Sequence, residues 1–194
     1  MMEWQSAVWI WISGLIFAIS HSVLATKYCK HWIYPYGCSE QRYRLLYSIF
    51  AVISTGLWIL FLHGLPDIPL YQTHGLLWLT LVSLQTLGGS IALAALLPID
   101  GLAFLGLRGS KGGVDPFIIR GIYRHIRHPM YSGVMLILLA MPEQSSNGLH
   151  FTLLVCLYFI IGARFEETRM LASHPDYADY RRRVAAFIPG TKGF

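Results

Sequence analysis

Charged residues are scarce in this chain. Aspartate, glutamate, lysine and arginine together make up 13% of its 194 residues, about half of the roughly 25% that is usual for soluble domains. Apolar residues make up 55%. This balance excludes an ordinary soluble domain and predicts an integral membrane protein. The length favours a single domain over residues 1–194, because a second core of ordinary size would not fit.

Other absences narrow the chemistry. The three cysteines are odd in number and lack metal or haem spacing, which predicts reduced thiols rather than a disulfide framework. The sequence has no glycine-rich phosphate loop, no Ser-His-Asp arrangement and no cluster of metal ligands, so we expect no bound metal. Residues 1–3 lack a basic n-region, and the apolar stretch 4–25 is longer than a signal-peptide core. We therefore expect that stretch to be a retained membrane helix.

Long apolar segments are what the sequence does have. Three reach the roughly 20 residues that span a bilayer, at 4–25, 45–63 and 75–98. Two more, 130–141 and 149–163, are shorter and are separated by a polar stretch. They are either two thin or tilted helices or a hairpin buried against the others. We expect an all-α membrane fold of about five transmembrane helices, with a helix 4–5 hairpin and a C-terminal interfacial helix over 176–184.

The basic residues predict the topology. All 15 lysines and arginines fall within three segments, 27–44, 108–127 and 164–192. By the positive-inside rule, the N-terminus is outside and the C-terminus is cytoplasmic, in the inner membrane if the protein is bacterial. The basic cytoplasmic face suits a membrane surface of anionic lipid, so the net charge of +5 does not point to nucleic acid. In the third apolar segment, 75–98, small residues around Gly88 predict close helix packing, and Gln85 is expected to face the bundle interior.

One stretch, Gly121–Gly133, organises the second half of the chain. A cationic, aromatic run that includes Tyr123 and Arg127 leads into Pro129, and an apolar run follows. Proline suits the first turn of a helix, so we predict a helix that begins at Pro129. Its free N–H groups and the nearby arginines would form an anion site, and Gly133 would let a ligand or another helix approach. The alternative is a simple positive-inside anchor.

A second polar group, Arg164-Phe-Glu-Glu-Thr-Arg169, follows the fifth apolar segment. If helices 4 and 5 form a hairpin, its carboxylates lie near the basic start of helix 4. A zwitterion with an ammonium and a carboxylate group would suit such a pocket. The alternative is a solvated helix end. Similarly, the tyrosines and arginines of 176–183 either close the pocket or form an interfacial belt.

These motifs resemble a known superfamily. Arg127-His-Pro-Met-Tyr-Ser-Gly133, Glu166-Glu167, Tyr177-x-x-Tyr180 and Phe187-Ile-Pro189 resemble the isoprenylcysteine carboxyl methyltransferases. In the first half, the resemblance is to the NnrU-like branch, which includes methanethiol S-methyltransferases. It rests on His21-Ser-Val-Leu-Ala25, Tyr43-Arg-Leu-Leu-Tyr-Ser48 and Asp100 with Leu105-Gly-Leu-Arg108. The resemblance covers about 21–189, with the motif-bearing half at 99–190.

The resemblance implies a membrane-embedded methyltransferase that uses S-adenosyl-L-methionine from the cytoplasmic side. It implies that Arg127 and Arg164 serve catalysis and that residues 115–118 touch the adenosine. The other implied cofactor-binding residues are Tyr123, His128, Pro129, Met130, Tyr131, Gly133, Glu166 and Glu167, and the adenosine segment contributes Phe117 and Ile118. The chain departs from the family pattern at Ser173-His174-Pro175, which leaves the roles of Tyr177 and Tyr180 open.

Three functions remain open at this point. The first is in-line methyl transfer to a small or apolar thiol, with a prenylcysteine carboxylate or a lipid amine as the alternative acceptor. The second is an NnrU-like haem-binding membrane protein, for which His21 and His31 are candidate ligands. The third is a catalytically silent membrane subunit that packs through its third helix. A sulfonium donor is already activated, so the lack of a general base does not argue against the first.

Overall fold

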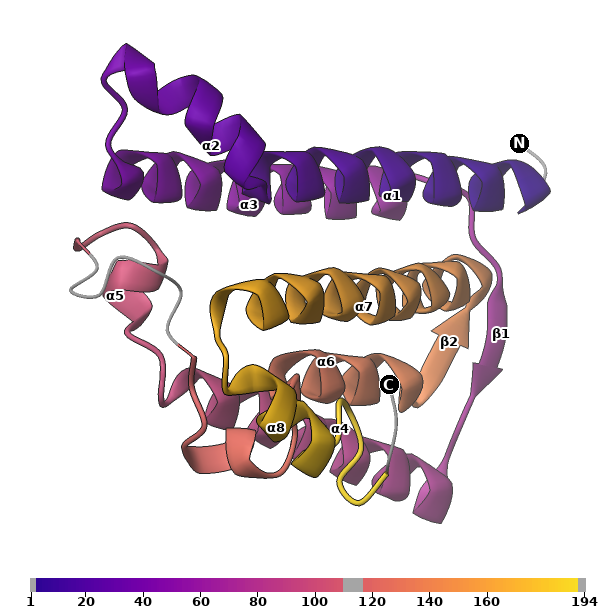
Figure 1. Cartoon of the computed structure of the whole chain (residues 1–194). Coiled ribbons are helices and arrows are strands. Elements are labelled where there is room, and N and C mark those ends of the chain that lie inside the picture. The colour runs from indigo at the N-terminus through magenta and orange to yellow at the C-terminus, as the bar shows by residue number, and fades with distance from the viewer. Residues whose placement is uncertain (1–2, 110–116, 192–194) are drawn as a thin grey trace. The chain divides into compact units, whose positions relative to one another are not determined.

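The computed structural model describes residues 3–109 and 117–191, and eight α-helices form most of that part (Figure 1). Four of these helices are long and apolar enough to cross a membrane. The chain divides into two compact units, one of residues 1–68 with 100–113 and one of 69–99 with 114–194. The all-helical membrane class predicted from the sequence is therefore confirmed. Lys111, Lys192 and the predicted adenosine contact Asp115 lie outside the described residues.

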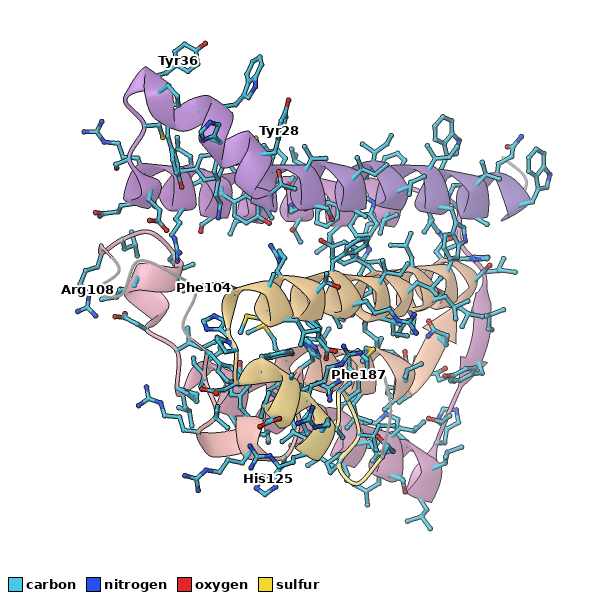
Figure 2. All side chains as sticks on the ribbon, in the orientation of Figure 1. Tyr28, Tyr36, Phe104, Arg108, His125 and Phe187 are labelled. Carbon is cyan, nitrogen blue, oxygen red and sulfur yellow. The ribbon has the colours of Figure 1, made fainter. Side chains whose placement is uncertain are left out.

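The first unit is built on two long helices, α1 (Glu3–Ala25) and α3 (Glu40–His63), joined through α2 (Lys27–Ile33) and a 3-10 turn, η1 (Tyr34–Tyr36). Side-chain oxygens cap the helix starts, because Thr26 accepts from the Cys29 amide and Ser39 from the Arg42 amide. Tyr28 on α2 and Tyr36 on η1 project away from the helices (Figure 2).

Polar contacts fix the register of α1 against α3. The buried ring of His21 stacks on Phe17, with centroids 3.9 Å apart. Its Nδ1 lies 2.8 Å from the Phe17 carbonyl oxygen, and its Nε2 lies 3.2 Å from the Ser54 hydroxyl. Tyr43 donates to the carbonyl of Leu24 at 2.5 Å. Both nitrogens of His21 thus already have partners, so this side chain joins two helices and offers no open nitrogen to a metal.

A short helix, α5 (Gly101–Phe104), completes the first unit. Asp100 caps it by accepting from the Ala103 amide, and it also pairs with Arg108. That guanidinium holds the pKa of the Asp100 carboxyl below its usual value. Gly106 has a φ of 78°, and a side chain there would meet the backbone of α3, 2.8 Å from the Gln41 carbonyl oxygen. The segment after α4 thus contains a short capped helix, and the turn that follows it lies against α3.

The second unit contains α4 (Gly75–Leu96), α6 (Pro129–Leu139) and α7 (Ser146–Ser173), with the short η2 (Gly121–Arg124) and α8 (Tyr177–Arg183) at one end. At the other end, β1 (Pro69–Gln72) pairs antiparallel with β2 (Glu143–Ser145), and Pro69 lies opposite Ser145. The pairing is reinforced by the Thr73 amide, which donates to the Pro142 carbonyl at 2.9 Å. This pair joins the loop before α4 to the loop between α6 and α7 (Figure 1).

Two glycines bring α4 and α6 together. A Cβ added to Gly88 would lie 2.7 Å from the Gly133 carbonyl oxygen, and one on Gly133 would collide with the Gly88 carbonyl. Farther along, Gln85 donates to the Ile137 carbonyl at 3.2 Å and to the Met141 sulfur at 3.1 Å. The predicted close packing and the inward-facing Gln85 are both confirmed. Gly133 serves the approach of a helix.

Of the last two apolar segments, the first is as short as expected and the second is much longer. The predicted helix start at Pro129 is confirmed, and α6 has 11 residues, about 16 Å at 1.5 Å per residue. By contrast, α7 has 28 residues, starts at Ser146 and continues through the polar group to Ser173. It does not end near residue 163 as expected, because the charges of 164–169 interrupt the apolar pattern but not the helical backbone.

Candidate functional site

The candidate site surrounds the first turn of α6, and the C-terminal segment holds it in place. The amides of Arg127 and His128 donate to the carbonyls of Ala185 and Ala186 at 2.8 and 3.0 Å. The Ser132 hydroxyl donates to the Phe187 carbonyl at 2.8 Å. In Figure 2, Phe187 lies among the side chains of the second unit, whereas His125 points away from it. The backbone that carries the Arg-His-Pro motif is thus fixed by residues more than fifty positions later.

Glu167 on α7 is the buried centre of an ion-pair cluster. Its Oε1 accepts from Arg127 Nε at 2.7 Å and from His128 Nε2 at 3.0 Å. Its Oε2 lies 3.1 Å from Arg181 Nε on α8. The side chains of Glu167 and Arg127 are only 6% and 3% exposed. Burying a carboxylate is costly unless it is fully paired, and here two guanidiniums and an imidazole surround it.

Arg127 is largely occupied by this cluster. Besides Glu167, it donates through Nη1 to the carbonyls of Arg181, at 3.0 Å, and Val184. Its Nη2 is buried and has no hydrogen-bond partner among the described residues. The guanidinium therefore joins α6, α7 and the end of α8, and it keeps one donor open.

Glu166 is placed differently. Its Oε2 accepts from the Tyr131 hydroxyl at 3.2 Å and lies 3.6 Å from His128 Nδ1. Its side chain is 42% exposed, so part of the carboxylate is open to a ligand. Tyr131 stacks between His128, at 5.5 Å, and Phe159, at 4.6 Å, with nearly parallel rings. A half-open carboxylate beside stacked aromatic faces is a suitable place for a cationic group.

The tyrosines of α8 form a separate aromatic cluster. The rings of Tyr177 and Tyr180 meet Phe117 at 5.3 and 5.2 Å. The Tyr180 hydroxyl donates to the Tyr123 carbonyl at 2.6 Å, and the Tyr123 hydroxyl donates to the Ala95 carbonyl at 3.3 Å. Burial raises the pKa of all three tyrosines. Their contacts indicate that they join η2, α4 and α8.

The sequence-predicted site residues therefore fall into groups. His128, Tyr131, Glu166 and Glu167 come together, and Arg127 joins them through Glu167. Pro129 is buried and Met130 half-buried in the same first turn, whereas Gly133 contacts α4. Arg164 is exposed on α7. Phe117 and Ile118 line an open depression of ≈ 400 Å³ with Ile119 and Arg120.

The sequence reasoning missed Phe159 and named Arg181 only as part of the segment 176–183 that could close the pocket. Phe159 lies seven residues before Glu166, a spacing that puts both on one face of a helix, and this signal was available. Arg181 belongs to a run of three arginines, and nothing in the run distinguishes it from Arg182, which pairs with the exposed Asp179. Among the described residues, no group of three His, Cys, Asp or Glu side chains could hold a metal ion.

The fold and the site define a helical membrane protein with a paired-carboxylate site at a helix start. Over residues 10–184 the chain matches the family described as NnrU protein. The chain belongs to the NnrU family. No solved structure matches it significantly.

Its curated relatives share one name. Methanethiol S-methyltransferase 2 of Bradyrhizobium diazoefficiens is 32% identical over 90% of this chain and 70% of its own length. Methanethiol S-methyltransferase of Pseudomonas deceptionensis is 27% identical over 91% of the chain and 70% of its own length. The protein of that name from Mycobacterium tuberculosis is 28% identical over 90% of the chain and 74% of its own length. These matches agree with the methyltransferase resemblance of the sequence motifs.

Proposed function

We propose that this protein is a membrane-embedded methyltransferase that transfers a methyl group from S-adenosyl-L-methionine to a small or apolar thiol. The observation that carries the proposal is the match to methanethiol S-methyltransferases over about 90% of the chain. The family match over residues 10–184 includes Arg127, His128, Glu166, Glu167 and Arg181. Thiol methylation is favoured over carboxylate or amine methylation because each of these relatives is named for a thiol acceptor.

The residues of the site suit this methyl donor. The half-open carboxylate of Glu166 would hold the ammonium group of the donor beside the aromatic rings of Tyr131 and Phe159. The unpaired Nη2 of Arg127 is a donor for which a carboxylate is the natural partner. When bound, the sulfonium supplies a methyl group that is already activated for transfer. Phe117 and Ile118 would contact the adenosine at the open depression.

The two arginines expected to act in catalysis take different parts in this proposal. Arg127 is held by Glu167 and by two backbone carbonyls, so it fixes the site and keeps only Nη2 for a ligand. Arg164 is exposed two residues before Glu166 on α7. A guanidinium there would stabilise a thiolate acceptor, which attacks more readily than the thiol. No base need remove a further proton, since thiolate methylation gives a neutral thioether.

The membrane topology we propose has five segments, with the N-terminus outside and the site at the cytoplasmic end. The β1–β2 pair supports it, because both strands lie in segments without lysine or arginine and must lie on the same side. Although α6 is short, the residues before and after it continue along α4, so that the whole segment from Tyr123 to Pro142 reaches from one end of α4 to the other. Tyr123 bonds to Ala95 near one end of α4, and Pro142 bonds to Thr73 just before the other.

The direct test is turnover by the purified protein in detergent. It is incubated with labelled S-adenosyl-L-methionine and, separately, with methanethiol, a longer alkanethiol and acetyl-farnesylcysteine. We expect label transfer to the thiols. Transfer to farnesylcysteine alone would replace the thiol with a carboxylate acceptor. Donor binding without any transfer would point to another acceptor, such as a lipid amine.

The haem-binding alternative has less support than the methyltransferase, because neither candidate haem ligand in the first unit is well placed. The buried His21 already uses both ring nitrogens within the α1–α3 pair, and His31 is exposed on α2. An absorbance spectrum of the purified protein, before and after addition of haem, separates the two functions. A Soret band that is lost in His21→Ala would favour the haem protein.

A further inference from the structure

We propose that Glu167 is a positioning residue for the reaction: by fixing the imidazole of His128, it aims the carboxylate of Glu166 at the methyl donor. This inference rests on the proposed function and extends it. Glu167 is unsuited to bind the donor itself, because its side chain is 6% exposed and both oxygens are taken by Arg127, His128 and Arg181. Its neighbour Glu166 has the open carboxylate.

The chemistry of the contact sets the tautomer of His128. A carboxylate held by two guanidiniums can only accept hydrogen bonds. The ring nitrogen that faces it, Nε2 at 3.0 Å from Oε1, must therefore carry a proton. Since the hydrogen bond of one ring nitrogen determines the state of the other, Nδ1 of the neutral ring carries no proton. It therefore cannot donate to Glu166, and the ring acts on Glu166 through Tyr131.

The ring has little freedom to choose another orientation. One face of the His128 ring stacks on Tyr131, at an interplanar angle of 2°, and Phe187 lies 5.6 Å away at a tilt of 34°. The His128 amide is bound to Ala186. With its plane and its Nε2 end both fixed, the His128 ring holds the stacked ring of Tyr131 in place, and the Tyr131 hydroxyl donates to Glu166 Oε2 at 3.2 Å. Glu166 thus receives its position from a residue that never contacts the ligand.

Three variants separate positioning from simple stability. In Glu167→Gln, the amide cannot pair with both arginines, so the imidazole loses its fixed acceptor. In His128→Gln, the amide can still donate from the Nε2 position to Glu167, but no ring remains for Tyr131 to stack on. The control, Tyr43→Phe, removes a hydrogen bond to the Leu24 carbonyl in the first unit and leaves the contact between Glu167 and His128 in place.

Calorimetry with S-adenosyl-L-methionine measures the donor Kd. Turnover with methanethiol as the acceptor gives kcat and the KM for the donor, and a thermal melt in detergent gives the melting temperature. We expect donor Kd and KM to rise about tenfold or more in Glu167→Gln and His128→Gln, as is typical when a bond to a charged group is lost. We expect kcat to change much less. Tyr43→Phe should lower the melting temperature and leave the donor Kd within about twofold of wild type.

An NMR measurement that does not require enzyme activity completes the test. The ¹⁵N shifts of labelled histidine, with the His128 signals assigned by their loss in His128→Gln, should show Nε2 protonated in wild type and changed in Glu167→Gln. A bare Nε2 in wild type would overturn the proposal. So would an unchanged donor Kd in Glu167→Gln at a lowered melting temperature. A wild-type protein that does not bind the donor would overturn the proposed function instead, and the nitrogen shifts would still decide whether Glu167 sets the tautomer.

Discussion

Glu166 and Glu167 are neighbours in the chain, yet only one of them is open. The Glu167 side chain is 6% exposed and ion-paired on both oxygens, whereas that of Glu166 is 42% exposed and meets Tyr131 and His128 through a single oxygen. Consecutive helix residues point about 100° apart, so a single step along α7 moves from the buried cluster to the ligand side.

Glu166→Gln is therefore expected to weaken S-adenosyl-L-methionine binding by about 1.5–3 kcal/mol, the usual size of a hydrogen bond to a charged group. Its melting temperature should stay close to that of wild type because Glu166 lies outside the ion-pair cluster. Calorimetry and a thermal melt measure the two effects. Equal donor affinity in wild type and Glu166→Gln would remove Glu166 from the site.

Gly133→Ala is expected to destabilise the second unit by about 1–3 kcal/mol, the usual cost of overpacking. The added methyl group would collide with the Gly88 carbonyl and lie 2.7 Å from the Ala92 amide nitrogen. Gly89→Ala is the matched control, since it lies next to Gly88 on α4 and a Cβ there meets nothing within 4 Å. Denaturation in mixed micelles compares them, and equal stability of the two variants would contradict the close contact.

Alkaline pH should destabilise the protein through Tyr177 and Tyr180, whose pKa values are raised by burial above the ordinary value near 10. Below about pH 10 these tyrosines are protonated in both states, and the stabilisation is fully present. As pH rises further, they ionise first in the unfolded chain, and the stabilisation is lost.

Thermal melts between pH 8 and pH 11 measure this loss, and absorbance at 295 nm follows tyrosine ionisation. Tyr180→Phe should be less stable at neutral pH, since it loses the bond to Tyr123, but its stability should fall less steeply at high pH. An identical alkaline slope in wild type and variant would show that Tyr180 does not contribute.

Reporter fusions test the topology. A reporter placed after Gly148 should be outside, and one placed at Phe194 should be cytoplasmic. A third fusion, after Asp67, should match the Gly148 fusion, because β1 starts just after Asp67, β2 ends just before Gly148, and the two strands pair. The same side for Gly148 and Phe194 would mean that α6 and α7 enter and leave the membrane on one face.

The sequence predicted the features that depend on local chemistry or long apolar runs. Pro129 marks a helix start because its missing N–H costs nothing there, and the small residues around Gly88 mark close packing because their side chains leave room. The three long N-terminal segments were recognised within a few residues. Only the start of α3 differs, at Glu40, five residues before the apolar run, because Ser39 caps it.

What the sequence could not predict depends on distant partners. The strands β1 and β2 are too short to show alternation, and each exists only because the other is present. Likewise, the division of roles between Glu166 and Glu167 depends on the position of Arg181 in space. The short α2 follows a cap at Thr26, a signal too common in loops to predict seven helical residues alone.

The bonds from residues 184–187 to the start of α6 also have a consequence for biosynthesis. Every membrane segment precedes Tyr177 in the chain, but the backbone partners of Arg127, His128 and Ser132 are Val184, Ala185, Ala186 and Phe187. During synthesis the whole helical bundle can enter the bilayer before the site exists. A polypeptide cut short just after α8 would be inserted and carry all the predicted cofactor-binding residues, yet it would lack the segment 184–187 that bonds to the start of α6.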